Sequence, residues 1–374
     1  MIELPSWPVS TSRERELLDQ VLASPQWGGF NPIVGEFEKA FAAYQGCEHG
    51  VAAVNGTVTL EMMLAAAGIG RGDEVIVPAI SFVSTASAVS RVGATPVFVD
   101  IEPYSFNMDP EQARQAISPA TKAILAVHFG GPLANMDALV ALAADKGLIL
   151  MEDAAHAHGA EWRGKRAGSF GLASSFSFQN GKVMTAGEGG IVLTDDAALA
   201  ERMRSYMNQG RRSGYTYFHH FEPGNNYRLS ALHAAVLIAQ LERLDEQIEN
   251  RMRNWRVFAD ELAGVPGITW QHIPEAVTRN PWYLLLGRVD GALGMTRDAF
   301  CERLHAAGIP ATPFYPHTLQ QNPMYVNGLP HRAPPCPNAD ACIGDAFWLP
   351  FRLLMGDAEK TREIAQALKH ALLG

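Results

Sequence analysis

The sequence predicts an α/β fold in which a central sheet is covered by helices on both faces. Between residues 35 and 195, continuous apolar segments of strand length alternate with amphipathic segments of helix length. Strands that are apolar along their whole length are typical of sheets buried on both sides. The length of 374 residues and the loss of this alternation after about residue 255 indicate a second, smaller domain.

The same alternation places each element. We expect strands at 51–54, 74–77, 95–100, 123–128 and 148–151, and helices at 36–44, 57–67, 81–92, 109–117 and 137–146. A long helix is expected at 230–250, followed by a strand at 283–288, a helix at 296–307, a Pro-rich loop at 310–337 and a closing helix at 357–373. We therefore expect a large domain at 1–250, which includes an N-terminal arm, and a small domain at 251–374.

Composition disfavours several classes of protein. The net charge of −9 and the absence of a Lys/Arg run argue against a nucleic-acid partner. The apolar stretches are too short for a membrane span, and the N-terminus does not have the pattern of a signal peptide, so we expect a cytoplasmic protein. Four scattered cysteines lack the spacing of a zinc site, and we expect them to be reduced.

Lys182 and Asp153 are the most informative residues. The strand at 148–151 runs into Glu152-Asp153, and Lys182 follows the strand-like pattern Ser175-Phe-Ser-Phe178. A lysine can form a Schiff base with an aldehyde cofactor, and an acid can keep the cofactor's ring nitrogen protonated. The pair therefore predicts pyridoxal 5'-phosphate. Alternatively, Lys182 is a surface lysine and Asp153 caps a helix.

Further residues could complete such a site. Gly56 and Thr57 lie between a strand and a helix, where backbone amides and a hydroxyl would face a phosphate, and Ser177 could add a second hydroxyl. Phe82 could cover one ring face, and His156 could stack on the ring or bond its phenolic oxygen. A metal site at His156, His158, Glu152 and Asp153 is the alternative, but the spacing is a weak one and we expect no metal.

In combination these segments resemble the DegT/DnrJ/EryC1/StrS family of sugar aminotransferases. The resemblance covers nearly the whole chain and rests on 55–57, 72–78, 152–159, 177–190 and 226–230. It implies the aspartate aminotransferase-like architecture of fold-type I pyridoxal phosphate enzymes. That architecture has a large domain with a mixed, mostly parallel sheet covered by helices, and a smaller C-terminal α+β domain.

The resemblance also implies roles for particular residues. Lys182 would be the Schiff-base lysine, Asp153 the partner of the pyridine nitrogen, and His156 a neighbour of the ring and its phenolic oxygen. The remaining cofactor contacts would be Gly56, Thr57, Val58 and Ser177 at the phosphate and Phe82 on one ring face. Asn226 would reach the phosphate of a neighbouring subunit, which implies a homodimer with shared active sites. Thr59 departs from the alanine that is usual in the family.

The implied activity is amino transfer from glutamate or glutamine to a keto-sugar or keto-cyclitol in amino-sugar or secondary-metabolite biosynthesis. Sugar dehydratases of the family carry histidine in place of Lys182. Segments near the start of the chain and around Lys182 resemble the branch that contains 3-amino-5-hydroxybenzoate synthases and scyllo-inosose aminotransferases. A dehydrating or aromatising enzyme of that type and a non-catalytic regulatory homologue are the alternatives. Arg228, Tyr315 and His317 are candidates for substrate recognition.

Overall fold

The computed structural model describes residues 2–373 and gathers the five expected strands of the first half into a seven-stranded sheet, together with the strand-like segment before Lys182 and one strand after it that was not predicted. The strands are β1 (His49–Ala53), β2 (Glu74–Pro78), β3 (Thr95–Val99), β4 (Thr121–Val127), β5 (Ile149–Asp153), β8 (Ala173–Ser177) and β9 (Gly190–Thr194). Their order is β1-β9-β8-β5-β4-β2-β3, and only β9 runs antiparallel to its neighbours. The sheet is therefore mixed and mostly parallel, as predicted.

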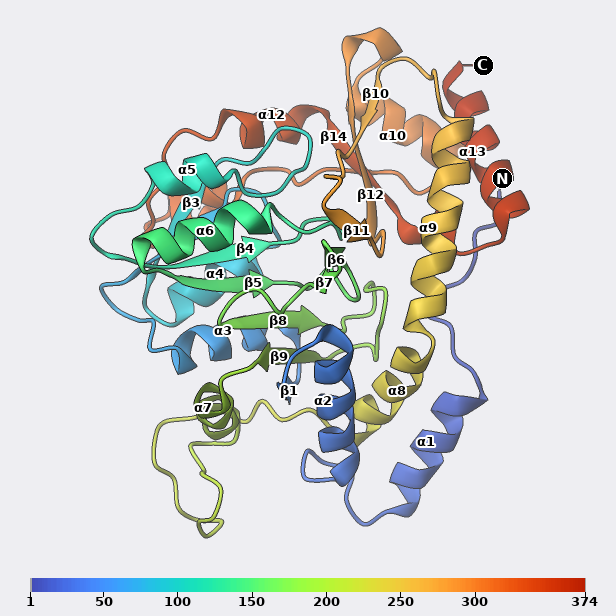
Figure 1. Ribbon diagram of the computed structural model, residues 1–374. Helices are drawn as coiled ribbons and strands as arrows, with labels where there is room; N and C mark the ends of the chain where they lie inside the picture. The colour runs from blue at the N-terminus through green and yellow to red at the C-terminus, as the bar shows by residue number, and fades with distance from the viewer. Residues whose placement is uncertain (1, 374) are drawn as a thin grey trace.

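Helices cover both faces of this sheet (Figure 1). One face carries α3 (Gly56–Ala66), α4 (Ser84–Arg91) and α7 (Ala197–Met207), and the other carries α2 (Pro32–Gln45), α5 (Pro110–Gln115), α6 (Met136–Lys146) and α8 (Ala231–Glu242). Along β2, Val75 and Val77 enter one hydrophobic cluster while Ile76 enters the other. Because successive side chains of a strand point to opposite faces, a strand between two helical layers is apolar throughout.

Two helices replace the single long helix expected at 230–250. The chain breaks at Arg243, and α9 (Leu244–Glu261) continues eleven residues beyond the expected end in a new direction (Figure 1). Arg243 donates hydrogen bonds to the Val9 carbonyl and the Thr11 hydroxyl and pairs with Glu14. These contacts hold the break against α1 (Ser12–Ala23), a helix that the periodicity did not predict.

A second, antiparallel sheet lies beside the first in the order β10-β12-β14-β13. Its strands are β10 (Ile268–Trp270), β12 (Leu284–Val289), β13 (Thr312–Pro313) and β14 (Ala346–Pro350). It shares a separate hydrophobic cluster with α9, α10 (Arg297–Ala306) and α13 (Ala358–Leu373). A small third sheet has the order β11-β6-β7, formed by β11 (Val277–Arg279), β6 (Glu161–Trp162) and β7 (Lys165–Arg166).

The segment expected as a Pro-rich loop carries short elements of its own. These are β13, the 3-10 helix η2 (Leu319–Gln321) and α11 (Pro323–Val326), and α12 (Pro337–Asp345) follows; the other 3-10 helices are η1 (Gly291–Leu293) and η3 (Phe351–Leu354). Arg332 pairs with Glu74 at 2.9 Å, and its carbonyl accepts from the Phe98 amide. The C-terminal part of the chain therefore packs against the large sheet, and the domain boundary at residue 250 stays a prediction.

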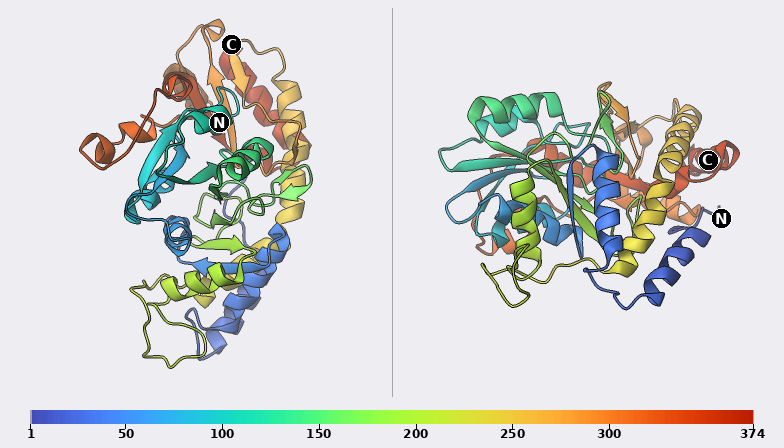
Figure 2. Two further views of the ribbon diagram at one scale, coloured as in Figure 1. Left: turned by 60° about the vertical axis from the view of Figure 1, so that its left-hand side comes forward. Right: turned by 60° about the horizontal axis from the view of Figure 1, so that its bottom comes forward.

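The loop that follows α7 extends away from the body of the molecule in all three views (Figures 1 and 2). It connects α7 to α8 and carries several exposed aromatic side chains, Tyr215, Tyr217, Phe218 and Phe221. Within residues 2–373, no helix is both long and apolar enough to span a membrane.

Glu152, near the end of β5, holds the loop at 168–171 by hydrogen bonds. Its fully buried carboxylate accepts hydrogen bonds from the amides of Gly168 (2.7 Å), Phe170 (2.8 Å) and Gly171 (3.1 Å). The Nε2 atom of His128 lies 2.9 Å from the same carboxylate. A side chain with two acceptor oxygens suits this position because several donors converge on it.

We therefore expect Glu152→Gln to lower the free energy of unfolding by about 2–4 kcal/mol, because the new amide group faces hydrogen-bond donors. Denaturant titration followed by circular dichroism measures the change. Glu16→Gln is the control, since Glu16 is exposed and pairs only with Arg13 at 3.4 Å; it should change stability by no more than about 0.5 kcal/mol. Equal losses in the two variants would contradict the anchoring role of Glu152.

Candidate active site

A cavity of about 590 Å³ opens where the carboxyl ends of the parallel strands meet the second sheet. In parallel sheets this edge is where ligands bind. The large sheet contributes Val127, Asp153 and Ser177 at the ends of β4, β5 and β8, and the second sheet contributes Leu284 and Trp348. The remaining lining residues are Asn55, Gly56, Thr57, Leu60, Ser81, Phe82, Ser84, Ala155, His156, Gln179, Lys182, Glu188, Tyr283 and Tyr315.

Asp153 is a buried acid at the end of β5, facing the opposite way from Glu152. Its Oδ2 accepts a hydrogen bond of 2.7 Å from the Thr85 hydroxyl, and its Oδ1 accepts from the Ala155 amide at 3.3 Å. The residues directly after Asp153 form a turn and not a helix, so Asp153 does not cap a helix as the alternative interpretation had it. Burial raises the pKa of Asp153 above its ordinary value, although these hydrogen bonds and the charge of Lys182 oppose the shift.

Lys182 lies in the loop between β8 and β9, with its side chain 9% exposed. Among the described residues, its ammonium group has no carboxylate within ion-pair distance and no hydrogen-bond acceptor. Its Nζ atom lies 4.6 Å from the centre of the Tyr283 ring. A buried lysine without a salt bridge is free to react with a ligand in the cavity. This position differs from that of an ordinary surface lysine, whose ammonium group lies in solvent.

A polar cradle lies at the first turn of α3. The Thr57 hydroxyl is 2.7 Å from the Ser84 hydroxyl, and both line the cavity. A Cβ atom at Gly56 would lie 2.7 Å from the Ser177 Cβ, so glycine is needed for this close approach. Val58 lies in the same turn, but its amide already donates to the Asn55 side chain at 3.0 Å. Hydroxyls and free amides at a helix N-terminus suit a phosphate.

His156 lies against Tyr283, with their ring centres 4.4 Å apart. Burial, and secondarily the charge of Lys182, lowers its pKa well below the usual value, so the ring is neutral. Its Nδ1 accepts from the Gly130 amide at 3.2 Å. The single ring hydrogen is therefore assigned to Nε2, which gives the neutral ring one free hydrogen-bond donor.

The four residues considered for a metal do not converge. His158 points into a cluster of Phe41, Phe176 and Phe178, and neither of its ring nitrogens has a hydrogen-bond partner among the described residues. Burial lowers its pKa to about 3. Glu152 faces the loop at 168–171 instead. His158 is thus packed as a neutral aromatic side chain rather than placed as a ligand.

The structure brings some of the other candidates to the cavity and leaves others outside it. Phe82 lies in its wall with the side chain 57% exposed, and Tyr315 lines it as well. His317 is half-buried outside the lining. Asn226 and Arg228 are also outside, at the base of the loop that follows α7, where Arg228 donates to the Asn208 side chain at 2.8 Å.

Several lining residues were not predicted. Tyr283 and Trp348 come from the second sheet, far from the recognisable segments, and no local pattern distinguishes them from core aromatics. Ser81, Ser84 and Thr85 lie close to the predicted Phe82, and a run of hydroxyl residues after a strand end was an available signal. The Ser81 and Thr85 hydroxyls are 2.6 Å apart, which joins them to Asp153 in one hydrogen-bonded chain.

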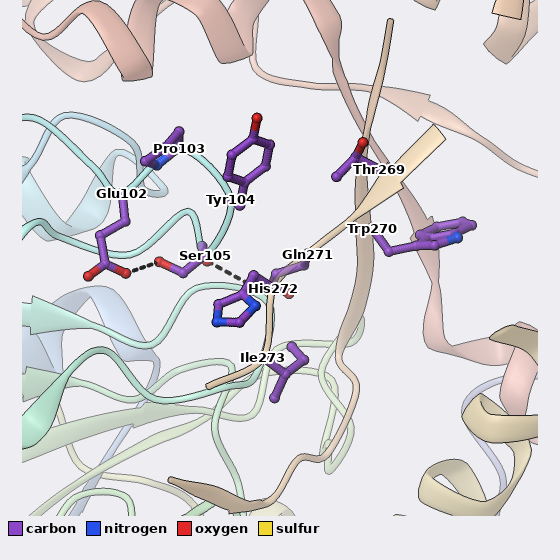
Figure 3. A pocket seen from close by; sticks show the side chains of 9 residues that line it. All are labelled: Glu102, Pro103, Tyr104, Ser105, Thr269, Trp270, Gln271, His272 and Ile273. Carbon is purple, nitrogen blue, oxygen red and sulfur yellow. Dashed lines mark hydrogen bonds between the residues drawn. The ribbon is translucent and has the colours of Figure 1, made fainter. Parts of the chain in front are cut away.

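A second hollow of about 560 Å³ lies between the turn at 102–105 and the residues of β10 and its continuation, 269–273 (Figure 3). Its polar groups bond to each other: the Ser105 hydroxyl donates to Glu102 at 2.6 Å, and Gln271 donates to the Ser105 carbonyl at 2.8 Å. No lysine lines it. Glu102 is an acid, but without a lysine beside it this hollow cannot support the chemistry expected of Lys182 and Asp153.

The residues of the main cavity fit pyridoxal phosphate. Within residues 2–373, the buried carboxylate of Asp153 has no cation in direct contact, and it would gain one from a protonated ring nitrogen. The cradle at Gly56, Thr57 and Ser177 leaves no room for a larger side chain and presents hydroxyls to a phosphate. A buried lysine and a buried acid facing one cavity at this edge define a pyridoxal phosphate-dependent transferase of fold type I.

Comparison with known proteins identifies the family. Residues 8–369 match the DegT/DnrJ/EryC1/StrS aminotransferase family, and the chain belongs to it. It is a pyridoxal phosphate-dependent aminotransferase.

Three relatives show the range of the family. The chain is 39% identical to the 3-amino-5-hydroxybenzoate synthase of Amycolatopsis mediterranei, over 99% of this chain and 97% of the relative. A crystal structure of 3-amino-5-hydroxybenzoic acid synthase superposes with a TM-score of 0.92 at 38% identity, covering 99% and 98% of the two chains. The GDP-perosamine synthase of Caulobacter vibrioides is 37% identical (98% of each chain). The L-glutamine:2-deoxy-scyllo-inosose aminotransferase of Micromonospora echinospora is 34% identical (98% and 93%).

The raised pKa of Asp153 predicts that its replacement has opposite effects on the stability of the cofactor-free protein and on activity. Without cofactor, the folded chain binds this proton more tightly than the unfolded chain, so the contribution to stability is present at low pH and is lost as pH rises through the folded pKa. At pH 7, Asp153→Asn should therefore leave the melting temperature of the cofactor-free protein unchanged or raise it. The same variant should lower activity by roughly 10- to 1000-fold, since one close charge sets the ring protonation.

Melting curves with and without excess pyridoxal phosphate, together with an activity assay, measure both effects. Asp137→Asn is the control, because hydrogen bonds from Trp162 and Arg163 lower the pKa of the exposed Asp137; its replacement should lower the melting temperature slightly and spare activity. Full activity of Asp153→Asn with unaltered stabilisation by the cofactor would rule out the assigned role.

Proposed function

We propose that the enzyme transfers an amino group from glutamate or glutamine to the ketone of a six-membered ring, and that a keto-cyclitol is favoured over a nucleotide-linked keto-sugar. The charge of the cavity is the observation that supports the choice of acceptor. Lys182 is the only lysine or arginine among the lining residues, and His156 is neutral. A diphosphate would find no second cation in the part of the site that this chain forms.

The shape of the lining favours a flat or chair-like ring. Aromatic side chains of Phe82, Tyr283, Tyr315 and Trp348 form much of the wall, and the polar groups cluster at the cradle of α3 and around Asp153. Apolar walls with few polar groups suit a ring that packs through its faces and is oriented by a few hydrogen bonds. Burial raises the pKa of Tyr315, so its phenol stays protonated and can donate to a ring hydroxyl.

The residues of the chain divide the work of amino transfer. The cofactor, when bound, supplies an aldehyde that carries the amino group and a ring that takes up carbanion charge. Lys182 binds it and, once released, accepts and returns a proton at Nζ. Asp153 keeps a negative charge opposite the ring nitrogen, and His156 offers the hydrogen on Nε2. Phe82 and Tyr283 restrict the access of water from the wall of the cavity.

A second candidate is dehydration and aromatisation of an aminated ring, as in a 3-amino-5-hydroxybenzoate synthase. The similarity to that enzyme, 39% over nearly the whole chain, supports it. Both reactions need the same lysine and acid, so the positions of Lys182 and Asp153 do not separate them. The mass of the product does, because aromatisation removes water whereas amino transfer does not.

A panel of substrates tests the proposal. Glutamate and glutamine are each paired with an inosose, an aminodehydroshikimate-type ring and a nucleotide-diphosphate keto-sugar, and products are followed by mass spectrometry. We expect kcat/KM for the inosose to exceed that for the nucleotide-linked acceptor by at least about tenfold, because the diphosphate lacks cationic partners. Lys182→Ala should be inactive with every pair. A preference for the nucleotide-linked acceptor would contradict the proposal, and an aromatic product would establish the second candidate.

We further propose that the active form is a homodimer in which the loop after α7 reaches a neighbouring subunit. Two observations support this. The loop carries Tyr215, Tyr217 and Phe218 with 57–82% of each side chain exposed, and exposed aromatic groups of this kind mark interaction surfaces. Asn226 and Arg228, at the base of the loop, lie outside the cavity of their own chain. A second copy would bring Asn226 to the phosphate cradle of the neighbouring site.

Mixing two inactive variants tests the shared site. Lys182→Ala removes the reactive amine, and Asn226→Asp puts a negative charge where a neighbour's phosphate would be. If each site takes Lys182 from one subunit and Asn226 from the other, a mixed dimer contains one intact site. Equal mixing should then restore about a quarter of wild-type activity. Light scattering reports the oligomeric state, and no recovery in proven mixed dimers would contradict the shared site.

A further inference from the structure

The segment from Asn280 to Tyr283, which leads into β12, is held in an unusual backbone conformation. Trp282 has φ of +53°, in the left-handed region that bulky residues rarely adopt. Its amide donates to the Asn280 side chain at 3.0 Å, and its indole stacks on Trp255 with ring centres 4.0 Å apart. Arg251, buried in α9, donates to the Pro281 carbonyl at 2.7 Å. These contacts from two directions fix the strained residue.

The turn after β4 is shaped to admit this segment. A Cβ atom at Gly131 would lie 2.8 Å from the Asn280 Oδ1 and 3.3 Å from the Tyr283 amide nitrogen. Gly131 also has φ of +127°, which disfavours any side chain. The large sheet thus leaves space for a segment of the C-terminal half to pass close by its edge.

The contacts of residues 280–283 fix the position of Tyr283 in the cavity wall. Its ring lies 4.6 Å from the Nζ atom of Lys182 and 4.4 Å from the ring of His156. Phe351 lies behind it at 6.4 Å, and Trp7 of the N-terminal arm packs edge-on against Phe351 at 5.0 Å. Tyr283 therefore contacts Lys182, the reactive amine of the proposed chemistry, and His156, and it is backed by other aromatic rings.

We propose that Tyr283 is the positioning residue of Lys182: its ring holds the free ammonium group over the cavity by a cation–π contact. The proposal rests on the proposed role of Lys182 as the reactive amine. An aromatic face attracts an ammonium group, and the attraction is stronger where water is excluded. A carboxylate in this place would favour the charged form and bind its proton more firmly. A ring holds the amine in place without forming an ion pair with it.

Replacement of the ring tests the proposal. We compare Tyr283→Leu, which removes the ring, with Tyr283→Phe, which removes only the hydroxyl. The main readout is the rate at which cofactor-free, full-length protein takes up pyridoxal 5'-phosphate, followed by the visible absorbance of the lysine-bound cofactor. We expect Tyr283→Leu to slow uptake and lower kcat by about tenfold with a smaller change in KM, and Tyr283→Phe to stay within about threefold of wild type.

Tyr104→Leu is the matched control. Tyr104 also faces a cation, with the Arg288 guanidinium 5.9 Å from its ring, but it lines the second hollow (Figure 3), whereas Lys182 lines the main cavity. Its replacement should leave uptake unchanged. If Tyr283→Leu lowers the melting temperature markedly, Tyr283→Met, whose longer and more flexible side chain adapts better to the space of the ring, takes its place in the same comparison.

Two results would overturn the proposal. Uptake and kcat of the ring-less variant equal to wild type would show that the ring does not position Lys182. A loss in Tyr283→Phe as large as in Tyr283→Leu would assign the effect to the hydroxyl instead. If the wild-type protein itself does not form the lysine-bound cofactor, the proposed role of Lys182 is wrong. That outcome differs from one in which only the proposal for Tyr283 fails, because there the wild-type protein still binds the cofactor.

Discussion

The site depends on the alternation of side chains at the end of β5. Glu152 and Asp153 are consecutive, so their carboxylates leave opposite faces of the sheet. Glu152 binds the amides of the loop at 168–171, which precedes β8, and β8 leads to Lys182. Asp153 faces the cavity. A shift of one residue in the register of β5 would exchange the two acids, removing the loop anchor and the cavity acid together.

Asp153 and Lys182 are both costly in the cofactor-free fold. The acid is buried with hydroxyl and amide donors but no salt bridge, and the lysine faces a ring rather than a carboxylate. Burying such groups without charged partners lowers stability unless a ligand compensates. A ligand with a protonated ring nitrogen would give Asp153 a charged partner, and the aldehyde of the same ligand would bond to Lys182. The stability that the chain lacks at this edge is therefore available as binding energy for the cofactor.

Most of the cofactor side could be predicted from the sequence because its residues lie in short segments next to strand ends. Asp153 and Thr57 lie at or just after recognisable apolar strands, Ser177 lies in an alternating strand-like pattern, and parallel strands bring their ends to one edge. Tyr283 and Trp348 could not be predicted, since they reach the cavity through the packing of a second sheet. The break at Arg243 was missed for a similar reason: contacts with α1, far away in sequence, hold it.

The residues that the sequence could predict and those that it could not also differ in function: the first are proposed to bind the cofactor, and the second are proposed to face the acceptor. The residues proposed to hold the cofactor come mostly from the edge of the large sheet, whereas the wall proposed to face an acceptor includes Tyr315 and Trp348 from the C-terminal part of the chain. Changes at Tyr315 or Trp348 can therefore alter the acceptor while leaving Asp153, Lys182 and Tyr283 in place. The relatives include enzymes named for a benzoate, an inosose and a GDP-sugar, as expected if the acceptor wall varies while the cofactor edge does not. In this chain the wall is aromatic and holds no cation, so a diphosphate-bearing acceptor would depend on charges from a second subunit.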